Sequence, residues 1–356
     1  MPSIIDTYKD DSIALLQRMI AMPSVSRDEQ AVADLLQQSL ASFGLLVNRQ
    51  GNNLWVRQSS CSADKPVILL NSHIDTVKPA AGYTRDPFVP TIENGRLYGL
   101  GSNDAGGSLV SLLAAFRYLT TREQPYHLIF AATAEEEVSG RNGVESILPI
   151  LGNIDFAIVG EPTQMQPAVA EKGLMVLDCT VHGQCGHAAR NEGINAIYEA
   201  LPDIEWFRTQ RFPRNSPFLG PVKMSVTQIQ AGTQHNVVPD ECRFVVDVRV
   251  NDMYTNTELL ELIKQSVACD VHERSTRLNS SHLDMLHPAV ERAMMLGLSP
   301  FGSPTMSDQA LMSFPTMKIG PGDSARSHTA DEYIEIDEIR RGIDTYISLL
   351  DGLDIM

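Results

Sequence analysis

Hydrophobic residues recur along the first part of the chain with two different spacings. They follow helical spacing in residues 11–22 and 106–119. Short, continuous apolar runs, typical of strands buried on both faces, occupy 67–73, 127–133 and 156–160. Strands that alternate with helices predict an α/β domain in which a mixed sheet lies between layers of helices.

The pattern changes after about Glu171, where polar and apolar positions begin to alternate. The predicted elements are, in order, a strand at 174–182, a helix at 191–207, strands at 222–230 and 242–250, a helix at 257–267 and a strand at 270–276. Alternation is typical of strands that bury one face only. This β-α-β-β-α-β order predicts a smaller α+β domain of the ferredoxin-like type.

The chain is therefore expected to form two domains, because its 356 residues exceed what one compact core usually holds. The first domain, residues 1–172 and 277–356, is discontinuous. The second, residues 173–276, is inserted into it. The polar segment Arg274–Ser281 is the expected return link between them.

Composition narrows the possible partners. A formal net charge of −16 repels phosphate backbones and anionic membranes, so neither nucleic-acid nor membrane binding is expected. The five cysteines are scattered without a C-x-x-C pair, which is typical of reduced thiols. The start of the chain lacks the basic and apolar segments of a signal peptide, and no apolar run could span a bilayer. These features predict a cytoplasmic protein.

Candidate chemistry begins with a histidine at the end of a predicted strand, where α/β sheets place their sites. His73 and Asp75 stand at the end of the run at 67–73 and share one side of an extended backbone. Such a histidine can bind a metal while the carboxylate fixes its second ring nitrogen. Taken alone, an ordinary loop histidine is the simpler interpretation of this pair.

Carboxylates follow the neighbouring strands in the same way. Asp104 lies in a glycine-rich turn that lacks the lysine of phosphate-binding loops, and its two oxygens could bridge two cations. The run Glu135–Glu137 and Glu161 each follow a buried strand. Clustered carboxylates repel one another and have raised pKa values unless metal ions neutralise them. A solvated acidic cluster and a capping carboxylate are the plain alternatives.

A late histidine, His328, follows the glycine-rich segment Gly320–Asp323, although a surface histidine there would be unremarkable. Jointly, these segments supply two histidines and several carboxylates at predicted strand ends. Mixed sets of this kind suit Zn²⁺, and also Co²⁺ or Mn²⁺. The sequence therefore predicts a metal site in the first domain.

The order of these motifs resembles the M20 family of metallopeptidases and aminoacylases over nearly the whole chain. The matching segments are HIDTV, GSNDAGG, EEEVSG, GEPT, GQCGH and the late histidine. Within the family, the segments Gly160–Thr163 and His328–Tyr333 are most similar to those of acetylornithine deacetylases. The resemblance implies a zinc-exopeptidase-like catalytic domain, interrupted by a lid or dimerisation domain.

The family pattern implies a metal-binding role for five residues and two Zn²⁺ ions per chain, with Co²⁺ or Mn²⁺ as possible substitutes. His73 and Glu161 would hold one ion. Glu137 and His328 would hold the other, and Asp104 would bridge both.

Other roles are implied in the same way. Glu136 would be the general base, and Asp75 would orient the first histidine. His187, in the inserted domain, would help to hold the oxyanion. Asn236 and Arg249 would grip the substrate carboxylate.

The resemblance implies hydrolysis of the amide bond of an N-acyl amino acid, with N-acetylornithine or N-acetylcitrulline, in arginine biosynthesis, as the expected substrate. A desuccinylase (acting on succinyl-diaminopimelate, succinylornithine or succinylcitrulline) and a dipeptidase are the alternatives, because the metal centre serves all three. Arg274 and Arg277 would matter for an acidic acyl group, although surface solvation is their simpler role.

A non-catalytic binding protein on the same scaffold is the third alternative, which the complete set of site residues disfavours. The resemblance also implies a homodimer formed through the inserted domain. One position departs from the family pattern, since Gly106 stands where many relatives have lysine.

Overall fold

The computed structural model describes residues 3–58, 64–190 and 192–355. Two sequence-based expectations therefore lie outside the described residues: the start of a helix at Asn191 and the state of the Cys61 thiol. Among the described cysteines, Cys179, Cys185, Cys242 and Cys269 are free.

The chain divides into two compact units. Unit 1 comprises Met1–Val169, Leu283–Phe301 and Ser307–Met356, and unit 2 comprises Ala170–His282 and Gly302–Met306. The predicted inserted domain, 173–276, falls within unit 2. The boundaries of unit 2 lie somewhat outside the predicted ones, and the unit also takes in the short segment Gly302–Met306.

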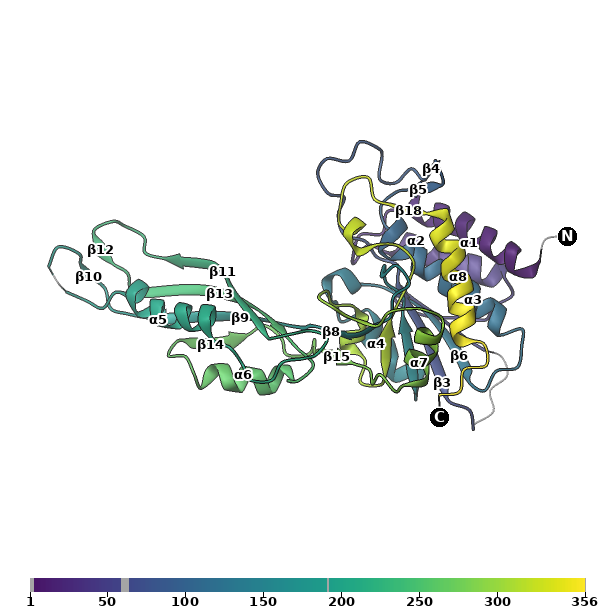
Figure 1. Ribbon diagram of the computed structural model, residues 1–356. Coiled ribbons are helices and arrows are strands. Elements are labelled where there is room, and N and C mark those ends of the chain that lie inside the picture. The colour runs from purple at the N-terminus through teal and green to yellow at the C-terminus, as the bar shows by residue number, and fades with distance from the viewer. Residues whose placement is uncertain (1–2, 59–63, 191, 356) are drawn as a thin grey trace. The chain divides into compact units, whose positions relative to one another are not determined.

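Unit 1 is built on a mixed sheet (Figure 1). Its strands are, in order across the sheet, β1 (Val47–Gln50), β2 (Asn53–Arg57), β6 (His127–Thr133), β3 (Val67–His73), β7 (Phe156–Val159), β17 (Thr316–Lys318) and β8 (Ala168–Glu171). Strands β6, β3, β7 and β17 run parallel, whereas β2 pairs with β6 in the antiparallel direction. The parallel strands therefore end together at one edge of the sheet.

Helices cover both faces of this sheet, as the continuous apolar runs predict. Leu69 and Ile129 pack on one face against α4 (Val144–Leu151). On the other face Phe130 packs against Phe116 of α3 (Gly107–Leu119), with ring centroids 6.1 Å apart. Neighbouring residues of a strand face opposite sides, so both faces need an apolar cover.

The remaining helices of unit 1 are α1 (Ile4–Ile20), α2 (Gln30–Ser42), α7 (Pro288–Met295) and α8 (Ile336–Leu350). Helices α1, α3 and α8 pack against one another (Figure 1). A small antiparallel sheet joins β4 (Thr91–Glu93), β5 (Arg96–Tyr98) and β18 (Tyr333–Glu335). The described residues include no helix that combines the length and apolarity needed to cross a membrane.

Unit 2 has the predicted ferredoxin-like order. Its main elements are β9 (Gly173–His182), α5 (Ala196–Thr209), β11 (Lys223–Ala231), β13 (Glu241–Val250), α6 (Asn256–Lys264) and β14 (Asp270–Glu273), and its shorter strands are β10 (Gly186–His187), β12 (Val237–Val238) and β15 (Ser281–His282). The four long strands form an antiparallel sheet in the order β11-β13-β9-β14. Strand β16 (Phe301–Ser303) pairs with β8, and a boundary between unit 1 and unit 2 falls within each of these two strands.

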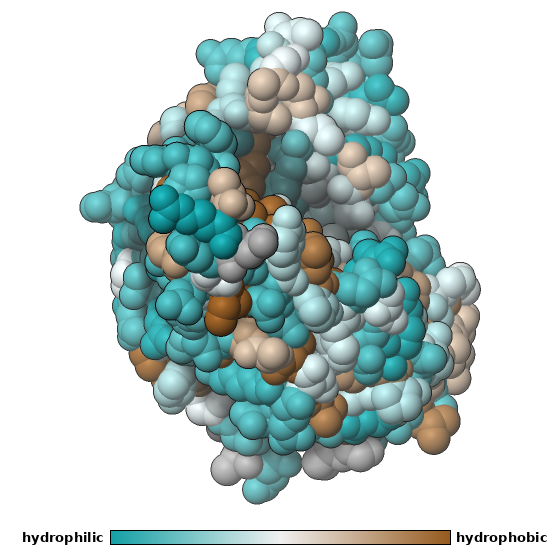
Figure 2. Space-filling view, turned by 90° about the vertical axis from the view of Figure 1, so that its left-hand side faces the viewer, coloured by the Kyte–Doolittle hydropathy of each residue, from teal (hydrophilic) through white to brown (hydrophobic). Residues whose placement is uncertain are grey.

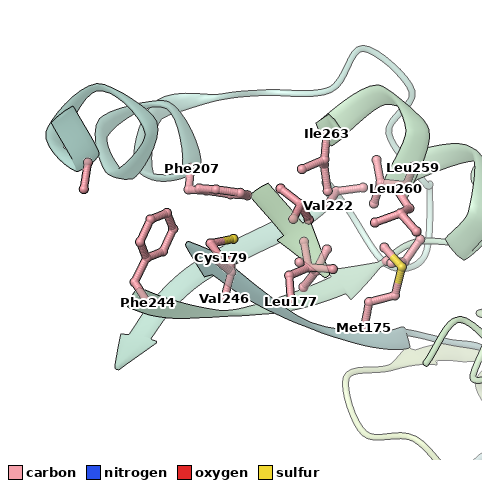
Figure 3. Packing of buried hydrophobic residues seen from close by; sticks show 14 of the residues in the cluster. Met175, Leu177, Cys179, Phe207, Val222, Phe244, Val246, Leu259, Leu260 and Ile263 are labelled. Carbon is pink, nitrogen blue, oxygen red and sulfur yellow. The ribbon is translucent and has the colours of Figure 1, made fainter. Parts of the chain in front are cut away.

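One face of the unit 2 sheet is apolar and holds both helices. Phe207 of α5 and Ile263 of α6 point toward Phe244, Val246 and Leu177 of the sheet (Figure 3). The alternate residues of β9 and β13 are partly or fully exposed, and most of them are polar, in keeping with the alternation in the sequence. In Figure 2 hydrophilic residues cover most of the visible surface, and hydrophobic residues are scattered among them.

Candidate metal centre

His73 closes strand β3 at the edge where the parallel strands end, and its side chain is 1% exposed. Ring atom Nδ1 lies 2.8 Å from the main-chain oxygen of Asp75 and 3.5 Å from its carboxylate Oδ1. Nε2 lies 3.3 Å from Oδ1 of Asp104 and 3.7 Å from Oε1 of Glu161. With Nδ1 donating to Asp75, Nε2 can present its lone pair to a metal.

The buried carboxylate of Asp75 connects two parts of the site. Its Oδ1 accepts the N–H of Glu136 at 3.0 Å, and its Oδ2 accepts the N–H of Glu137 at 3.2 Å and the Ser26 hydroxyl at 2.7 Å. Burial acts to raise the pKa of Asp75, but hydrogen bonds, first that of His73, outweigh burial and lower this pKa. Asp75 therefore links the histidine to the turn after β6.

The three glutamates of that turn have different surroundings. Glu135 has a left-handed backbone conformation, with φ 58°, and its Oε1 accepts a hydrogen bond from the Asn142 amide at 3.0 Å. Oε2 of Glu137 lies 2.9 Å from Nε2 of His328. His328 also has a left-handed backbone, with φ 59°. Such conformations are uncommon outside glycine and cluster at functional sites.

Asp104 lies in the turn Ser102–Gly106, between β5 and α3. Its backbone, with φ −117° and ψ 101°, departs from helical values, and the peptide bond that follows it is cis. Its Oδ1 lies 3.3 Å from Nε2 of His73, and its Oδ2 lies 3.7 Å from Nε2 of His328. The two oxygens of one carboxylate thus face two different histidines.

The site is closed on one side and open on the other. The side chain of His73 is 1% exposed, whereas that of His328 is 55% exposed. Asp104 lies between them at 13%. A small molecule can therefore reach this edge of unit 1 from the side of His328.

Burial raises the proton affinity of the acids that lie deepest. Burial, followed by the charge of Glu161, raises the pKa of Glu136 well above its ordinary value. Burial likewise raises the pKa of Glu161 to about 8. For Asp104 burial acts in the same direction, but the hydrogen bond with His73 outweighs it and lowers the pKa. The acids thus need a compensating positive charge.

The two histidines supply that charge by taking up protons. Burial acts to lower the pKa of His73, yet the carboxylates of Asp104 and Asp75 raise it well above its ordinary value. The hydrogen bond with Glu137 is the main cause that raises the pKa of His328 to about 9. A divalent cation offers the same compensation with more charge.

The donor set fits such a cation. Ligand atoms of His73, Glu136 and Glu161 lie within 4.8 Å of one another, and so do those of His73, Asp104 and Glu137. Imidazole nitrogen with carboxylate oxygen is the donor chemistry of zinc sites. His328 joins them through its contacts with Asp104 and Glu137, so the structure brings together all five residues for which the family resemblance implies metal binding, with Glu136 in the same cluster.

Two buried acids of the site were not found by sequence reasoning. Glu332 is 2% exposed and accepts N–H bonds from Gly101, Asn103 and Asp104, while burial raises its pKa to about 8. Asp308 is 4% exposed. Neither follows a buried strand, so the signal that marked the other acids is missing for both.

Asp308 accepts hydrogen bonds from the Asn71 amide and the Thr133 hydroxyl, both at 2.9 Å. Burial raises its pKa to about 6. Asn71 and Thr133 belong to β3 and β6, so Asp308 ties together the ends of two strands that carry site residues.

The packing around Gly106 leaves no room for a side chain at this position. A Cβ atom at this position would lie 2.5 Å from the main-chain oxygen of Gly101 and 2.6 Å from Cδ1 of Leu16. Both distances are well inside normal contact, so a lysine could not occupy this position without moving the turn.

The other predicted site residues belong to unit 2. His187 lies in β10 opposite Val237 of β12, and its Nδ1 accepts the N–H of Ala189 at 3.2 Å. The N–H of Ala188 donates to the main-chain oxygen of Asn236 at 3.1 Å. The structure therefore brings His187 and Asn236 together in one small antiparallel pair.

Arg249 lies apart from that pair, on β13, and its guanidinium donates to both oxygens of Asp247 at 2.9 and 3.0 Å. Lys172 and Lys223 lie close enough to Arg249 for their charges to interact. Burial, and after it the positive charges of Lys223 and Arg249, lowers the pKa of Lys172. Unit 2 thus contains a local group of three cations, of which Arg249 alone was expected from sequence.

Comparison with known families agrees with this geometry. The sequence profile described as peptidase family M20/M25/M40 matches residues 69–352, which include every candidate metal ligand. The chain belongs to this family. The resemblance and the fold expected from it are thereby confirmed.

Curated members of the M20 family include relatives at modest identity. The chain is 29% identical over 358 residues to an acetylornithine deacetylase of Proteus mirabilis, covering 91% of this chain and 92% of that protein. It is 27% identical over 279 residues to a succinyl-diaminopimelate desuccinylase of Delftia acidovorans, covering 72% and 71%.

Solved structures of the M20 type share the fold. Aminopeptidase PepT from Bacillus cereus superposes with a TM-score of 0.76 at 17% identity, covering 96% of this chain and 98% of that one. The YXEP protein of Bacillus subtilis, described as a dinuclear metal-binding peptidase of the M20 family, superposes with a TM-score of 0.75 at 16% identity, covering 97% and 98%.

Proposed function

We propose that this M20 hydrolase is a di-zinc deacylase that removes the acyl group from the α-nitrogen of a small N-acyl amino acid. The observation that carries the proposal is the convergence of His73, Asp104 and Glu161 on one side and Glu137 and His328 on the other. The shared position of Asp104 supports two cations rather than one. The dinuclear metal binding described for the YXEP protein supports the same number.

When bound, zinc would neutralise the clustered carboxylates and polarise the amide carbonyl of the substrate as a Lewis acid. The protein must then move a proton from the attacking water to the leaving nitrogen. Glu136 is assigned to this step because the family pattern implies it and because its carboxyl lies beside the candidate ligands His73 and Glu161. A carboxyl so placed can accept a proton from the attacking water and return it to the leaving nitrogen.

Asp75 keeps the base in position. Its carboxylate accepts the main-chain N–H groups of Glu136 and Glu137, and its main-chain oxygen receives Nδ1 of His73. We therefore assign Asp75 the role of aligning the histidine and the base at once.

Three residues of unit 2 are assigned to the substrate. His187 would donate to the oxyanion. The family pattern implies that Asn236 and Arg249 bind the substrate carboxylate, and because the two lie apart within unit 2, one copy of unit 2 would not supply both. The neighbouring Lys172 and Lys223 support the second assignment, because they add positive charge near Arg249.

We also propose a homodimer formed through unit 2. Strand β11 is at the edge of its sheet, and Tyr198 and Leu201 of α5 are 67% and 54% exposed. An edge strand beside exposed apolar residues is a surface on which a second copy can pack. Light scattering of the purified protein tests this; a monomer at micromolar concentration would contradict it.

Acetyl is the preferred acyl group, since the deacetylase relative aligns over 91% of this chain and the desuccinylase over 72%. The test is a panel of N-acetyl and N-succinyl derivatives of ornithine, citrulline and diaminopimelate, with a dipeptide, assayed on zinc-loaded protein. N-acetylornithine or N-acetylcitrulline should be hydrolysed fastest. Faster cleavage of succinyl derivatives would favour the desuccinylase, and no hydrolysis of any amide would overturn the proposal.

A further inference from the structure

We propose that Glu332 is a positioning residue that holds the Asp104 turn in the shape required for two cations. The proposal rests on the proposed metal-dependent function. Its basis is a buried carboxylate whose oxygens accept three main-chain N–H groups of that turn.

The three hydrogen bonds are short and come from neighbouring residues. Oε2 of Glu332 accepts the N–H of Gly101 at 3.0 Å. Its Oε1 accepts the N–H groups of Asn103 and Asp104 at 2.8 and 2.9 Å. The main chain that leads into the candidate bridging ligand, and the N–H group of that ligand itself, are thus fixed by one side chain.

The turn needs such a partner because of its backbone shape. Gly101 is left-handed, with φ 76°, and Asp104 departs from helical values, so a regular helical hydrogen-bond pattern does not continue through it. Asn103 is fully buried. A buried N–H without an acceptor is costly, and Glu332 supplies acceptors for three of them.

Only a carboxylate can satisfy this arrangement. Each oxygen of Glu332 acts as an acceptor, and an ionised carboxylate has no donor. In Glu332→Gln, an NH₂ group would replace one of the two oxygens and face an N–H group. That variant changes hydrogen bonding without changing side-chain length.

Glu332 also joins two ligand-bearing segments. It stands shortly after His328 in the chain, while its partners stand in the turn of Asp104, 231 residues from Gly101. A second link joins the same two segments. The side-chain amide of Asn103 donates to the main-chain oxygen of Asp323 at 3.0 Å, and its Oδ1 accepts the N–H of Asp323 at 2.9 Å. These hydrogen bonds therefore fix the segments that carry the ligands His328 and Asp104 relative to each other.

Asp331 provides a matched control beside Glu332. Its Oδ1 accepts the main-chain N–H groups of Thr84 and Arg85 at 2.9 and 3.1 Å, so it ties the same segment to a different loop. Its backbone is left-handed, with φ 55°, a conformation that asparagine tolerates. Asp331→Asn therefore perturbs the segment without touching the Asp104 turn.

The experiment titrates Co²⁺ into metal-free wild-type, E332Q, E332D and D331N proteins. It follows the cobalt absorption bands and the heat of binding, and circular dichroism checks the fold. E332Q should bind Co²⁺ about 10- to 100-fold more weakly than wild type, with altered bands, the effect typical of groups that orient metal ligands. E332D, which keeps the acceptors on a shorter side chain, should fall between E332Q and wild type.

D331N should keep wild-type affinity. Wild-type affinity in folded E332Q, or an equal loss in D331N, would overturn the role of Glu332. If E332Q does not fold, E332D decides, and wild-type affinity there would overturn it. Absence of Co²⁺ binding in the wild-type protein itself would instead overturn the proposed function, and this inference with it.

Discussion

Unit 1 and unit 2 both pair opposite charges on their surfaces, but unit 1 also has a cluster of buried acids at its strand ends. In unit 2 opposite charges pair on the surface, as in Arg274 and Asp178, whose side chains are 55% and 47% exposed. In unit 1 like charges gather at the strand ends, where Glu136 and Glu161 lie close to one another and to His73. Each unit has a well-packed apolar core, so the difference concerns the charges alone.

The difference shows which charges need an explanation beyond solubility. An exposed pair contributes about 0–1 kcal/mol and can be lost with little effect. Buried like charges are unfavourable unless a positive charge compensates them. The fold keeps the unit 1 cluster despite this cost, as expected of a cation site. Substituting one charged residue at a time in each unit tests this difference.

The largest effect is expected from Glu136→Gln in unit 1. The variant removes the proposed proton carrier while leaving the metal ligands, so kcat should fall about 10²- to 10⁴-fold with metal content unchanged. Glu135→Gln is the control, because Glu135 bonds to Asn142 instead. Turnover of Glu136→Gln close to wild type, or an equal loss in Glu135→Gln, would show that the base is misassigned.

His187→Ala in unit 2 should have the next largest effect. Loss of one oxyanion donor lowers kcat about 10²- to 10³-fold in other enzymes, and metal content should not change. His182→Ala provides the comparison, since His182 is exposed and lies 3.3 Å from Asp270. A parallel loss of metal in His187→Ala would make His187 a ligand or a folding residue.

Metal binding to unit 1 should release protons at pH 7. The pKa of Glu161 is about 8 and that of His328 about 9 without metal, so both groups hold protons at pH 7 that a ligand must lose. Affinity should therefore rise as the pH increases from 7 through about 8 and about 9, where these two groups lose their protons. Calorimetry in buffers of different ionisation enthalpy measures the release; a heat of binding that is independent of buffer would contradict the raised pKa values.

Arg274→Ala in unit 2 should have the smallest effect. The exposed pair with Asp178 should contribute no more than about 1 kcal/mol to stability, and kcat/KM for acetylated substrates should not change. Thermal unfolding and a steady-state assay measure both quantities. A selective loss of activity on N-succinyl substrates would instead assign Arg274 to the acyl pocket and favour the desuccinylase.

Strand-end chemistry could be predicted from sequence because it follows a local pattern. His73, Glu137 and Glu161 each come directly after an apolar run, and parallel strands bring such positions to one edge. The ferredoxin-like order of unit 2 was equally visible in its alternating strands. Both predictions depend on residues that are close together in the chain.

The supporting residues could not be predicted, because their partners are distant in sequence. Glu332 follows His328 in a polar segment that resembles a surface loop, and its bonds to the Asp104 turn span more than two hundred residues. Asp308 similarly meets Asn71 from 237 residues away. The family-like segment His328–Tyr333 includes Glu332, but neither that motif nor any periodicity shows which turn its carboxylate contacts.

Metal stoichiometry tests the central claim most directly. Elemental analysis of purified protein, after chelation and after reconstitution with zinc, should be combined with an assay of N-acetylornithine hydrolysis on the same samples. We expect two divalent cations per reconstituted chain, and activity that is lost with them and returns with them. Full activity in protein shown to be free of metal would contradict it.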